Sequence, residues 1–223
     1  MHISVVIPVL NERAHLQEAM DQLAPFVRQG GQALVVDGGS TDGTPALASQ
    51  LGFTVIRSGP GRARQMNAGA HHATGDALLF LHIDTRLPDG WQQQIAASLQ
   101  SAHAWGRFDV RISGRARMLK VVACMMNGRS RMTGIATGDQ AMFMTRTAFN
   151  QVGGFPDQPL MEDIEISKRL LRLSRPACLH DKVTTSGRRW ESRGVWTTIF
   201  LMWRLRFAYW RGHSASLLAK AYQ

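Results

Sequence analysis

Segments typical of strands alternate with segments typical of helices along the first hundred residues of this chain. The run Ile3–Val9 is apolar and rich in β-branched residues, as expected of a strand buried on both faces. Further strands are predicted over 33–36, 53–56 and 77–83, and helices over 16–27, 44–51, 62–73 and 91–99. Asn11 stands where it can cap the first of these helices. This alternation predicts an α/β fold in which helices cover both faces of a mostly parallel sheet.

The second half of the chain gives weaker patterns and ends in a segment of different composition. Strands are predicted over 108–112 and 141–144, and helices over 118–126, 146–152 and 161–173. The chain has a formal net charge of +10, and residues 186–223 hold seven of its 26 Lys and Arg, one acid and four of its six Trp. We therefore divide the chain into an α/β domain, residues 1–185, and a basic aromatic helical segment, residues 186–223.

Composition excludes several classes of protein. The hydrophobic content of 44% is too high for a disordered chain, and two cysteines cannot build a disulfide scaffold or a cysteine-rich zinc site. A Gly-x-Gly-x-x-Gly motif after the first strand and a Gly-Lys-Ser/Thr motif are both lacking. The first residues show no signal-peptide pattern, and the uncharged run 194–203 is about half of the ~20 residues that span a bilayer. We therefore expect a cytoplasmic protein.

Polar residues gather where the predicted parallel strands end. Asn11 and Glu12 follow the first strand, the run 37–42 follows the second, and Asp84 follows the strand at 77–83. Ligands of open α/β sheets bind outside the carboxyl ends of the strands, so these positions point to a binding crevice. Asp37 and Asp42 bracket four small residues, a pattern that suits either contact with a flat ligand or a turn with a helix N-cap.

Three further positions carry charges suited to chemistry on a phosphorylated ligand. Arg62 opens a predicted helix and can bind a diphosphate together with the backbone N–H groups there, or it can lie on a solvated basic face. On a strand, His82 and Asp84 share a face, and Asp84 can hold Mg²⁺ or Mn²⁺ jointly with phosphate oxygens. Glu162 and Asp163 open the last predicted helix, where acids stabilise the helix dipole or supply a general base.

Several motifs together resemble family 2 glycosyltransferases of the GT-A fold, a Rossmann-like architecture. They are the runs 3–12 (ISVVIPVLNE), 35–44 (VVDGGSTDGT), 62–70 (RARQMNAGA), 79–85 (LFLHIDT), 154–156 (GFP) and 161–163 (MED). The resemblance covers residues 1–173, and the run 62–70 with Thr185–Trp190 is similar to a subgroup of small bacterial members. It implies an inverting, metal-dependent transfer of a sugar from a nucleotide-diphosphate sugar to a hydroxyl acceptor, with Mn²⁺ or Mg²⁺ as cofactor.

The resemblance also implies roles for particular residues. Asp163 is implied as the general base, with Glu162 beside it, and Asp84 as the ligand of the divalent metal. The implied nucleotide-binding residues are Pro8, Asn11, Glu12, Asp37, Asp42 and Arg62, and the implied acceptor-side residues are Gly138, Asp139 and Gln140. His82 replaces the first acid of the family's Asp-x-Asp motif and is either a metal ligand or a core histidine. His180 stands where a late metal-ligating histidine is expected, or is a surface histidine beside Asp181.

Apolar residues recur every three to four positions in the C-terminal segment, which predicts an amphipathic helix. The stripe consists of Val195, Trp196, Ile199, Phe200, Trp203, Phe207 and Trp210, with arginines at 193, 204, 206 and 211. A basic helix with Trp suits the interface of an anionic membrane, which makes peripheral contact through residues 190–211 at the inner membrane face one interpretation. It would also suit a lipid-linked or apolar acceptor. The second interpretation is that this helix packs on the core or on a second copy of the chain in a homodimer.

Two classes of function follow from these patterns. The first is the glycosyltransferase described above. The second is a non-enzymatic basic module that binds anionic lipid or nucleic acid on a similar scaffold, as the net positive charge permits. The acids at the strand ends would repel a phosphate backbone, so nucleic acid is not expected as a partner and the enzyme is favoured.

Overall fold

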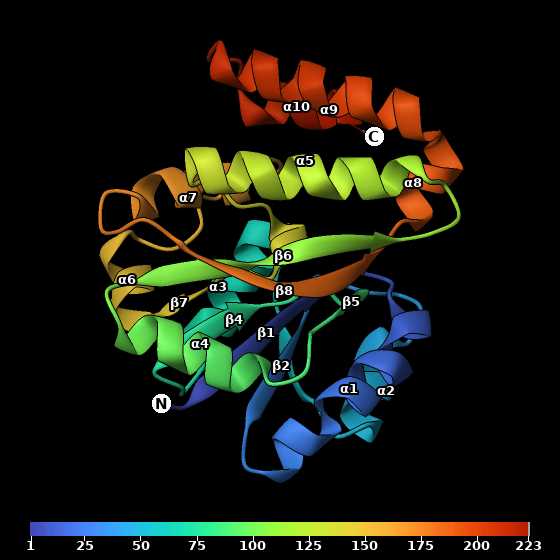
Figure 1. The fold of residues 1–223 in the computed structure, drawn as a ribbon. Helices are drawn as coiled ribbons and strands as arrows, with labels where there is room; N and C mark the ends of the chain where they lie inside the picture. Colours follow the sequence, from blue (N-terminus) through green and yellow to red (C-terminus); the bar gives the residue numbers. More distant parts are fainter. Residues whose placement is uncertain (223) are drawn as a thin grey trace.

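The computed structural model describes residues 1–222, with the exception of the Arg189 side chain; that side chain and Gln223, both in the C-terminal segment 186–223 defined above, lie outside the described part. The protein is built on one eight-stranded sheet with the strand order β3-β2-β1-β4-β7-β6-β8-β5 (Figure 1). The strands are β1 (Ile3–Val9), β2 (Gln32–Asp37), β3 (Thr54–Arg57), β4 (Ala77–Phe80), β5 (Thr85–Arg86), β6 (Trp105–Ser113), β7 (Phe143–Thr145) and β8 (Ala177–Ser186). The helices are α1 (Leu16–Arg28), α2 (Thr44–Gln50), α3 (Arg62–His72), α4 (Trp91–Gln100), α5 (Met118–Thr133), α6 (Arg146–Gln151), α7 (Glu162–Leu170), α8 (Arg188–Arg193), α9 (Val195–Trp210) and α10 (Ala215–Tyr222), with 3₁₀ turns η1 (Arg13–His15) and η2 (Gly138–Gln140).

The sheet is mostly parallel, as the strand–helix alternation predicts. β1 pairs in parallel with β2 and β4, β2 with β3, and β6 with β8. The short strand β7 runs antiparallel to both β4 and β6 and joins the two parallel parts, while β5 closes the edge antiparallel to β8. The carboxyl ends of β1 and β2 therefore open toward the same edge of the sheet, where a ligand site is expected.

Successive strand residues point into two separate cores, which explains why the strands are apolar on both faces. In β1, Val5 and Ile7 belong to one core and Val6 to the other; in β4, Leu79 and Leu78 divide in the same way. The first core also receives α1, α2, α4 and α5, and the second receives α3, α6 and α7. The expectation of helices on both faces is therefore confirmed.

Helix α3 lies unusually close to the sheet and ties two strand ends together. A Cβ atom at Gly69 would lie 2.3 Å from a methyl group of Val6, so only glycine permits this approach. One turn earlier, the buried Gln65 donates from Nε2 to the carbonyl oxygens of Val9 at 2.7 Å and Val36 at 2.9 Å. The side chain thereby fixes the ends of β1 and β2, from which the loops at the candidate site depart.

Two local predictions are wrong. Asn11 does not cap a helix, because the chain first forms η1 and then α1, and neither receives a side-chain cap. The strand predicted over 77–83 ends at Phe80, and the N–H of Thr85 donates to the carbonyl oxygen of His82 at 3.0 Å. His82 and Asp84 therefore lie in a turn and do not share the face of a strand.

The C-terminal helices form a third apolar cluster beside α7. Leu205 of α9 and Leu218 of α10 are buried against Met161 and Ile164. The aromatic side chains on the outer side of α9 remain exposed, so α9 is apolar on both sides and the predicted amphipathic character is not confirmed. Among the described residues, no helix has the length and apolar character needed to cross a membrane.

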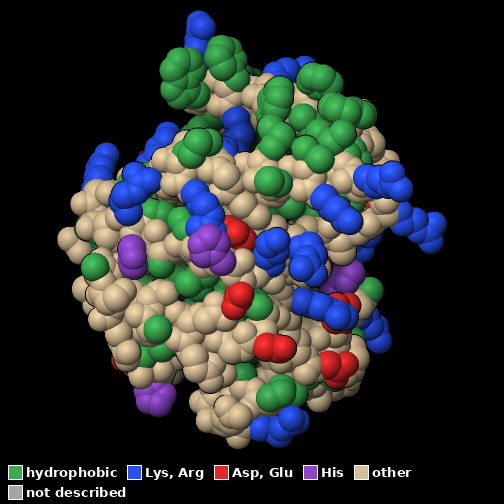
Figure 2. Space-filling model, in the orientation of Figure 1, with side chains coloured by type: hydrophobic (Ala, Val, Ile, Leu, Met, Phe, Trp, Pro, Cys, Tyr) green, Lys and Arg blue, Asp and Glu red, His purple; other side chains and the backbone are tan. Residues whose placement is uncertain are grey.

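Large hydrophobic side chains are exposed mainly on three helices. In the described chain they number eleven, and all except Met1 and Leu10 lie on α5, α9 or α10. Figure 2 shows hydrophobic side chains gathered at the top of the molecule, where α9 and α10 lie, with Lys and Arg side chains around them. We call this the aromatic surface: Val121, Met125, Met132, Trp196, Phe200, Trp203, Phe207, Trp210 and Leu217. The three helices carry six Lys and Arg and no acid.

Replacement of Gln65 by methionine tests the connection between β1 and β2. Gln65→Met keeps the side-chain volume but withdraws both donated hydrogen bonds from a buried place. We expect the free energy of unfolding, measured by urea denaturation, to fall by about 1–3 kcal/mol. Gln93→Met on the exposed side of α4 is the control and should change it by less than about 0.5 kcal/mol. Equal effects of the two changes would show that Gln65 has no special part in the fold.

Candidate active site

The loops that follow β1 and β2 are held together by hydrogen bonds across them. The N–H of Asn11 donates to Oγ of Ser40 at 2.8 Å, and Oδ1 of Asn11 accepts from the N–H of Thr41 at 2.9 Å. Asn11 adopts a left-handed conformation, with φ of 55°, which turns its side chain toward the second loop. The N–H of Glu12 donates to Oγ1 of Thr44 at 3.0 Å. The expected nucleotide-binding residues Asn11 and Glu12 thus form one rim with the loop after β2, and Pro8 lies in β1 opposite Val36.

The two aspartates of the second loop have different surroundings. Asp37 is buried at the end of β2, and its carboxylate accepts from the N–H groups of Gly39 at 3.1 Å and Ser40 at 3.2 Å. Asp42 accepts from both the hydroxyl and the N–H of Thr44, and the hydroxyl is the main cause that lowers the pKa of Asp42. Asp42 therefore stabilises the start of α2 through Thr44, one position before the N-cap Gly43, whereas Asp37 keeps acceptor capacity at the strand end.

The C-terminal segment reaches the same rim. Nη1 of Arg188, in α8, lies 2.9 Å from Nε2 of His15, and this ring nitrogen lies 3.8 Å from the carboxylate of Glu12. Sequence reasoning assigned no role to Arg188, because it lies more than 170 positions from His15. The long strand β8, which was not predicted, carries the chain back to this end of the sheet.

A second group of charged residues lies where α3 and α7 begin. Nη1 of Arg62 is 3.8 Å from Oε1 of the buried Glu162. The pKa of Arg62 is raised, because the charges of Glu162, Asp139 and Asp163 outweigh the desolvation of the guanidinium. Arg62, Glu162 and Asp163 line a narrow pocket, whose other walls are Met66, Phe80, His82, Gly138, Met142 and Phe155. The structure thus brings together Arg62, which was predicted to bind the diphosphate, the acids Glu162 and Asp163, and Gly138 of the predicted acceptor side.

Asp163 is held in place by two backbone donors. The N–H of Ile164 donates to Oδ1 at 2.7 Å, and the N–H of Gly138 donates to Oδ2 at 3.1 Å. Burial, together with the charge of Glu162, raises the pKa of Asp163 to about 6, although the two donors and Arg62 act in the opposite direction. A carboxylate with such a pKa accepts a proton readily near neutral pH and is still mainly ionised at pH 7.

His82 places one ring nitrogen beside Asp139 and buries the other. Nδ1 lies 3.2 Å from Oδ1 of Asp139, and Nε2 faces Gly138, where an added Cβ atom would lie only 2.6 Å away. Gln140 is fully buried, and its side chain binds the N–H of Thr137 and Asn127. Gly138 therefore lines the pocket and Asp139 lies beside its wall residue His82, but the expectation that Gln140 lines the acceptor side is wrong, because Gln140 is fully buried and its amide stabilises η2.

Asp84 is a half-buried carboxylate that forms no hydrogen bond or ion pair with the described residues. Nor do the residues that the structure describes include a group of three or more His, Cys, Asp or Glu side chains placed to hold a metal. A divalent cation at Asp84 would thus take its other ligands from substrate phosphates and water, a coordination that Mg²⁺ and Mn²⁺ accept. The residues present fit a metal shared between protein and diphosphate.

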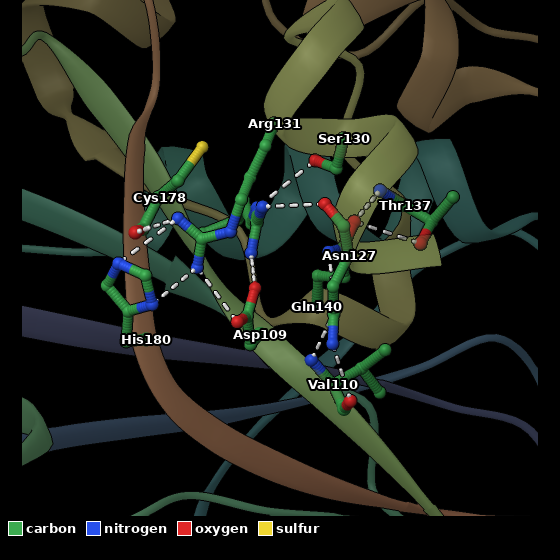
Figure 3. A network of polar contacts seen from close by, with 10 residues as sticks. Asp109, Val110, Asn127, Ser130, Arg131, Thr137, Gln140, Cys178 and His180 are labelled. Atoms are coloured by element: carbon green, nitrogen blue, oxygen red, sulfur yellow. Dashed lines mark hydrogen bonds and ion pairs between the residues drawn. The ribbon is translucent and has the colours of Figure 1, made fainter. Parts of the chain in front are cut away.

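His180 is not placed to share a metal with Asp84. Figure 3 shows its ring beside the guanidinium of Arg131, whose Nη2 lies 3.1 Å from Nδ1 of His180 and 2.8 Å from Oδ2 of Asp109. Thr185, not His180, pairs with Thr85, the neighbour of Asp84. His180 lies five residues earlier on β8, or about 16 Å away at 3.3 Å per residue. The prediction of a metal ligand at His180 is therefore wrong.

Solved structures resemble this fold closely. The mannosyltransferase PcManGT from Pyrobaculum calidifontis, solved with GDP-Man and Mn²⁺, matches with a TM-score of 0.67 at 21% identity, covering 93% of this chain and 61% of that one. TarS 1–349 from S. aureus matches with a TM-score of 0.66 at 20% identity, covering 84% and 61%. At such identities the likeness shows the GT-A fold alone.

Sequence relatives and a family model point the same way. The β-monoglucosyldiacylglycerol synthase of Synechocystis sp. is 23% identical over 87% of this chain and 47% of its own length. A PGL/p-HBAD biosynthesis glycosyltransferase of Mycobacterium bovis is 37% identical over 38% of this chain and 36% of its own. The chain thus spans about half the length of the curated relatives it matches, or less. The model described as "Glycosyl transferase family 2" matches residues 4–153. With this match over most of its length, the chain belongs to glycosyl transferase family 2.

Proposed function

We propose that this protein transfers a sugar from a nucleotide-diphosphate sugar to a hydroxyl acceptor, with inversion at the anomeric carbon. The observation that carries the proposal is the carboxylate of Asp163, with its pKa of about 6, in the same pocket as Arg62. One group can accept a proton and the other can bind a diphosphate. The family match ends at residue 153, so the role of Asp163 is supported by this geometry and by the motif 161–163.

The loops after β1 and β2 are proposed to bind the nucleotide. Asp37 accepts from the base with the capacity that its two backbone donors leave, while Asn11 and Glu12 line the pocket beside Pro8. Asp42 supports this site from the start of α2. Structures with similar folds bind UDP, UDP-GlcNAc or GDP-Man, which supports a nucleotide donor without choosing its base or sugar.

The charge of the leaving diphosphate is proposed to be balanced by Arg62 and by a divalent cation held at Asp84. Arg62 opens α3, so backbone N–H groups of its first turn are available to the same phosphates. The cation, when bound, neutralises charge that develops on the leaving nucleoside diphosphate. Two neighbouring structures contain Mn²⁺, one of them with UDP, which supports a metal without separating Mn²⁺ from Mg²⁺.

Proton transfer is proposed to occur at Asp163. As the acceptor oxygen attacks the anomeric carbon, its proton moves to a carboxylate oxygen of Asp163 and the bond to the diphosphate breaks. The N–H of Gly138 and that of Ile164 fix the carboxylate during this step. A single displacement of this kind inverts the anomeric centre and needs no covalent intermediate with the protein.

The acceptor is proposed to come from a membrane surface, which the aromatic surface contacts. Its five exposed aromatic side chains on α9 suit the interface of a bilayer, and the surrounding Lys and Arg, without any acid on α5, α9 or α10, suit anionic lipid. A second copy of the chain would bring like charges together. The relative named as a monoglucosyldiacylglycerol synthase acts, by its name, on a lipid, which also supports this choice.

The pH dependence of turnover tests the role of Asp163. We expect kcat/KM to fall tenfold per pH unit below an apparent pKa of about 6, because the protonated carboxyl cannot accept the acceptor's proton. Glu162→Gln should move this limb to lower pH, since it removes a negative charge that raises the pKa of Asp163. Asp163→Asn should lower kcat about 10²- to 10⁴-fold and leave nucleotide binding, followed by calorimetry, unchanged. Loss of nucleotide binding in Asp163→Asn would contradict the assignment.

Thermal unfolding with GDP or UDP tests the metal at Asp84. Mn²⁺ and nucleotide together should raise Tm by several degrees in the wild-type protein, and Asp84→Asn should remove the part that requires Mn²⁺. Asp181→Asn, an exposed acid of β8, is the matched control and should keep the full response. A Mn²⁺-dependent rise of Tm that persists in Asp84→Asn would place the cation elsewhere.

Sedimentation with vesicles tests the aromatic surface. The protein should bind vesicles of phosphatidylglycerol and phosphatidylcholine more strongly than pure phosphatidylcholine. Replacing both Trp203 and Phe207 by serine should weaken binding by about tenfold or more, because two exposed rings no longer enter the interface. Leu10→Ser, an exposed apolar residue outside the surface, should have no effect. A self-association in lipid-free solution that the double variant abolishes would instead identify a second copy as the partner.

A further inference from the structure

Buried side-chain polar atoms without partners occur on two of the described residues. Only three buried side-chain nitrogen atoms of the described residues lack a hydrogen bond, and they are Nε2 of His82 and Nε and Nη2 of Arg129. Native proteins pair nearly all such atoms, so each exception calls for an explanation. Both residues lie close to the candidate base, since His82 lines its pocket and the charge of Asp163 acts on Arg129.

The C-terminal part of α5 is fixed to the helix that carries Asp163. After α5 ends, the N–H of Ala136 donates to Oγ of Ser167 at 3.2 Å, and this hydroxyl donates to the carbonyl oxygen of Asp163 at 2.7 Å. Arg129 therefore projects from an element whose position relative to α7 is defined. Arg129 is only partly buried, so part of it lies at the protein surface and not in the core.

The other arginines nearby are paired, whereas Arg129 is not. Arg107 and Arg131 both form ion pairs with Asp109, and Arg107 also donates to Ser130. No ion pair or hydrogen bond of the Arg129 side chain occurs within the part of the chain that the structure describes. Burial lowers the pKa of Arg129 and Arg107 lowers it too, while Asp163 opposes the shift. This partly buried guanidinium can donate hydrogen bonds, but it has no acceptor among the described residues.

We propose that Arg129 binds an oxyanion, either a phosphate or a carboxylate, carried by the acceptor. Two parallel donors of one guanidinium match two oxygens of such a group. Anchoring this group beside Asp163 would orient a neighbouring hydroxyl toward the base and favour acidic acceptors over neutral ones. The assignment of this anion to the acceptor rests on the proposed function, whereas the anion site itself does not. His82 offers no second anchor, because Gly138 covers its free nitrogen.

Thermal unfolding without nucleotide tests the anion site. Inorganic phosphate, glycerol phosphate, acetate and glycerol are the probes, and the variants are Arg129→Met and Lys120→Met, an exposed cation about 14 Å away along α5. Saturating phosphate or glycerol phosphate should raise Tm by about 5 °C in the wild type and in Lys120→Met, and by less than 1 °C in Arg129→Met. A larger response to glycerol phosphate than to phosphate identifies a monoester; a response to acetate identifies a carboxylate. Glycerol should have no specific effect.

Two further measurements separate the possible failures. Ligand-free Arg129→Met should unfold at the same temperature as the wild type or higher, because it removes an unpaired buried charge. Arg62→Met should lose the response to nucleotide with Mn²⁺ and keep the response to phosphate. An anion response that survives in Arg129→Met, or no anion response in the wild type, overturns the proposal. If anions raise Tm only when Arg129 is present, and nucleotide with Mn²⁺ does not raise Tm at all, the anion site would stand and the proposed glycosyltransferase activity would be rejected.

Discussion

The guanidinium of Arg62 is the positive charge on which the arrangement of acids in the pocket depends. Glu162, Asp163 and Asp139 reach it from α7 and η2, while Arg62 itself stands on α3, against the first half of the sheet. Three carboxylates gathered in partly buried space would repel one another without a cation between them. Arg62 thus joins the nucleotide half of the molecule to the half that carries the proposed base, and it keeps Asp163 ionised more readily than burial alone would.

The N-terminal half of the fold could be predicted from the sequence because its strands are apolar on both faces and its helices are periodic. The same signal fails for β8, which carries the exposed and polar residues 180–182 in the middle of a strand. It fails also at His82, where Leu81 and Ile83 are buried and imitate a continuing strand while the backbone already turns. An apolar run indicates which residues are buried, but it does not indicate whether their backbone continues the hydrogen bonds of a strand.

The predicted site residues that the structure brings together lie at strand or helix ends. Arg62 and Asp163, about a hundred residues apart in sequence, line one pocket, whereas His180 was assigned from position alone and lies beside Arg131. Gln65 and Arg129 were missed for a different reason. Each is a polar residue within a helix. Only the three-dimensional structure reveals that Gln65 donates hydrogen bonds to two strand ends, whereas the side chain of Arg129 has no hydrogen-bond partner among the described residues.

The two-sided character of α9 has a mechanical consequence. Its inner side rests on Met161 and Ile164, the residues that flank the Glu162–Asp163 pair, while its outer side presents bare rings to the surroundings. Anything that contacts those rings is therefore separated by one helix from the two residues next to the candidate base. The same helix thus both presents an apolar surface and supports the start of α7, where Glu162 and Asp163 lie.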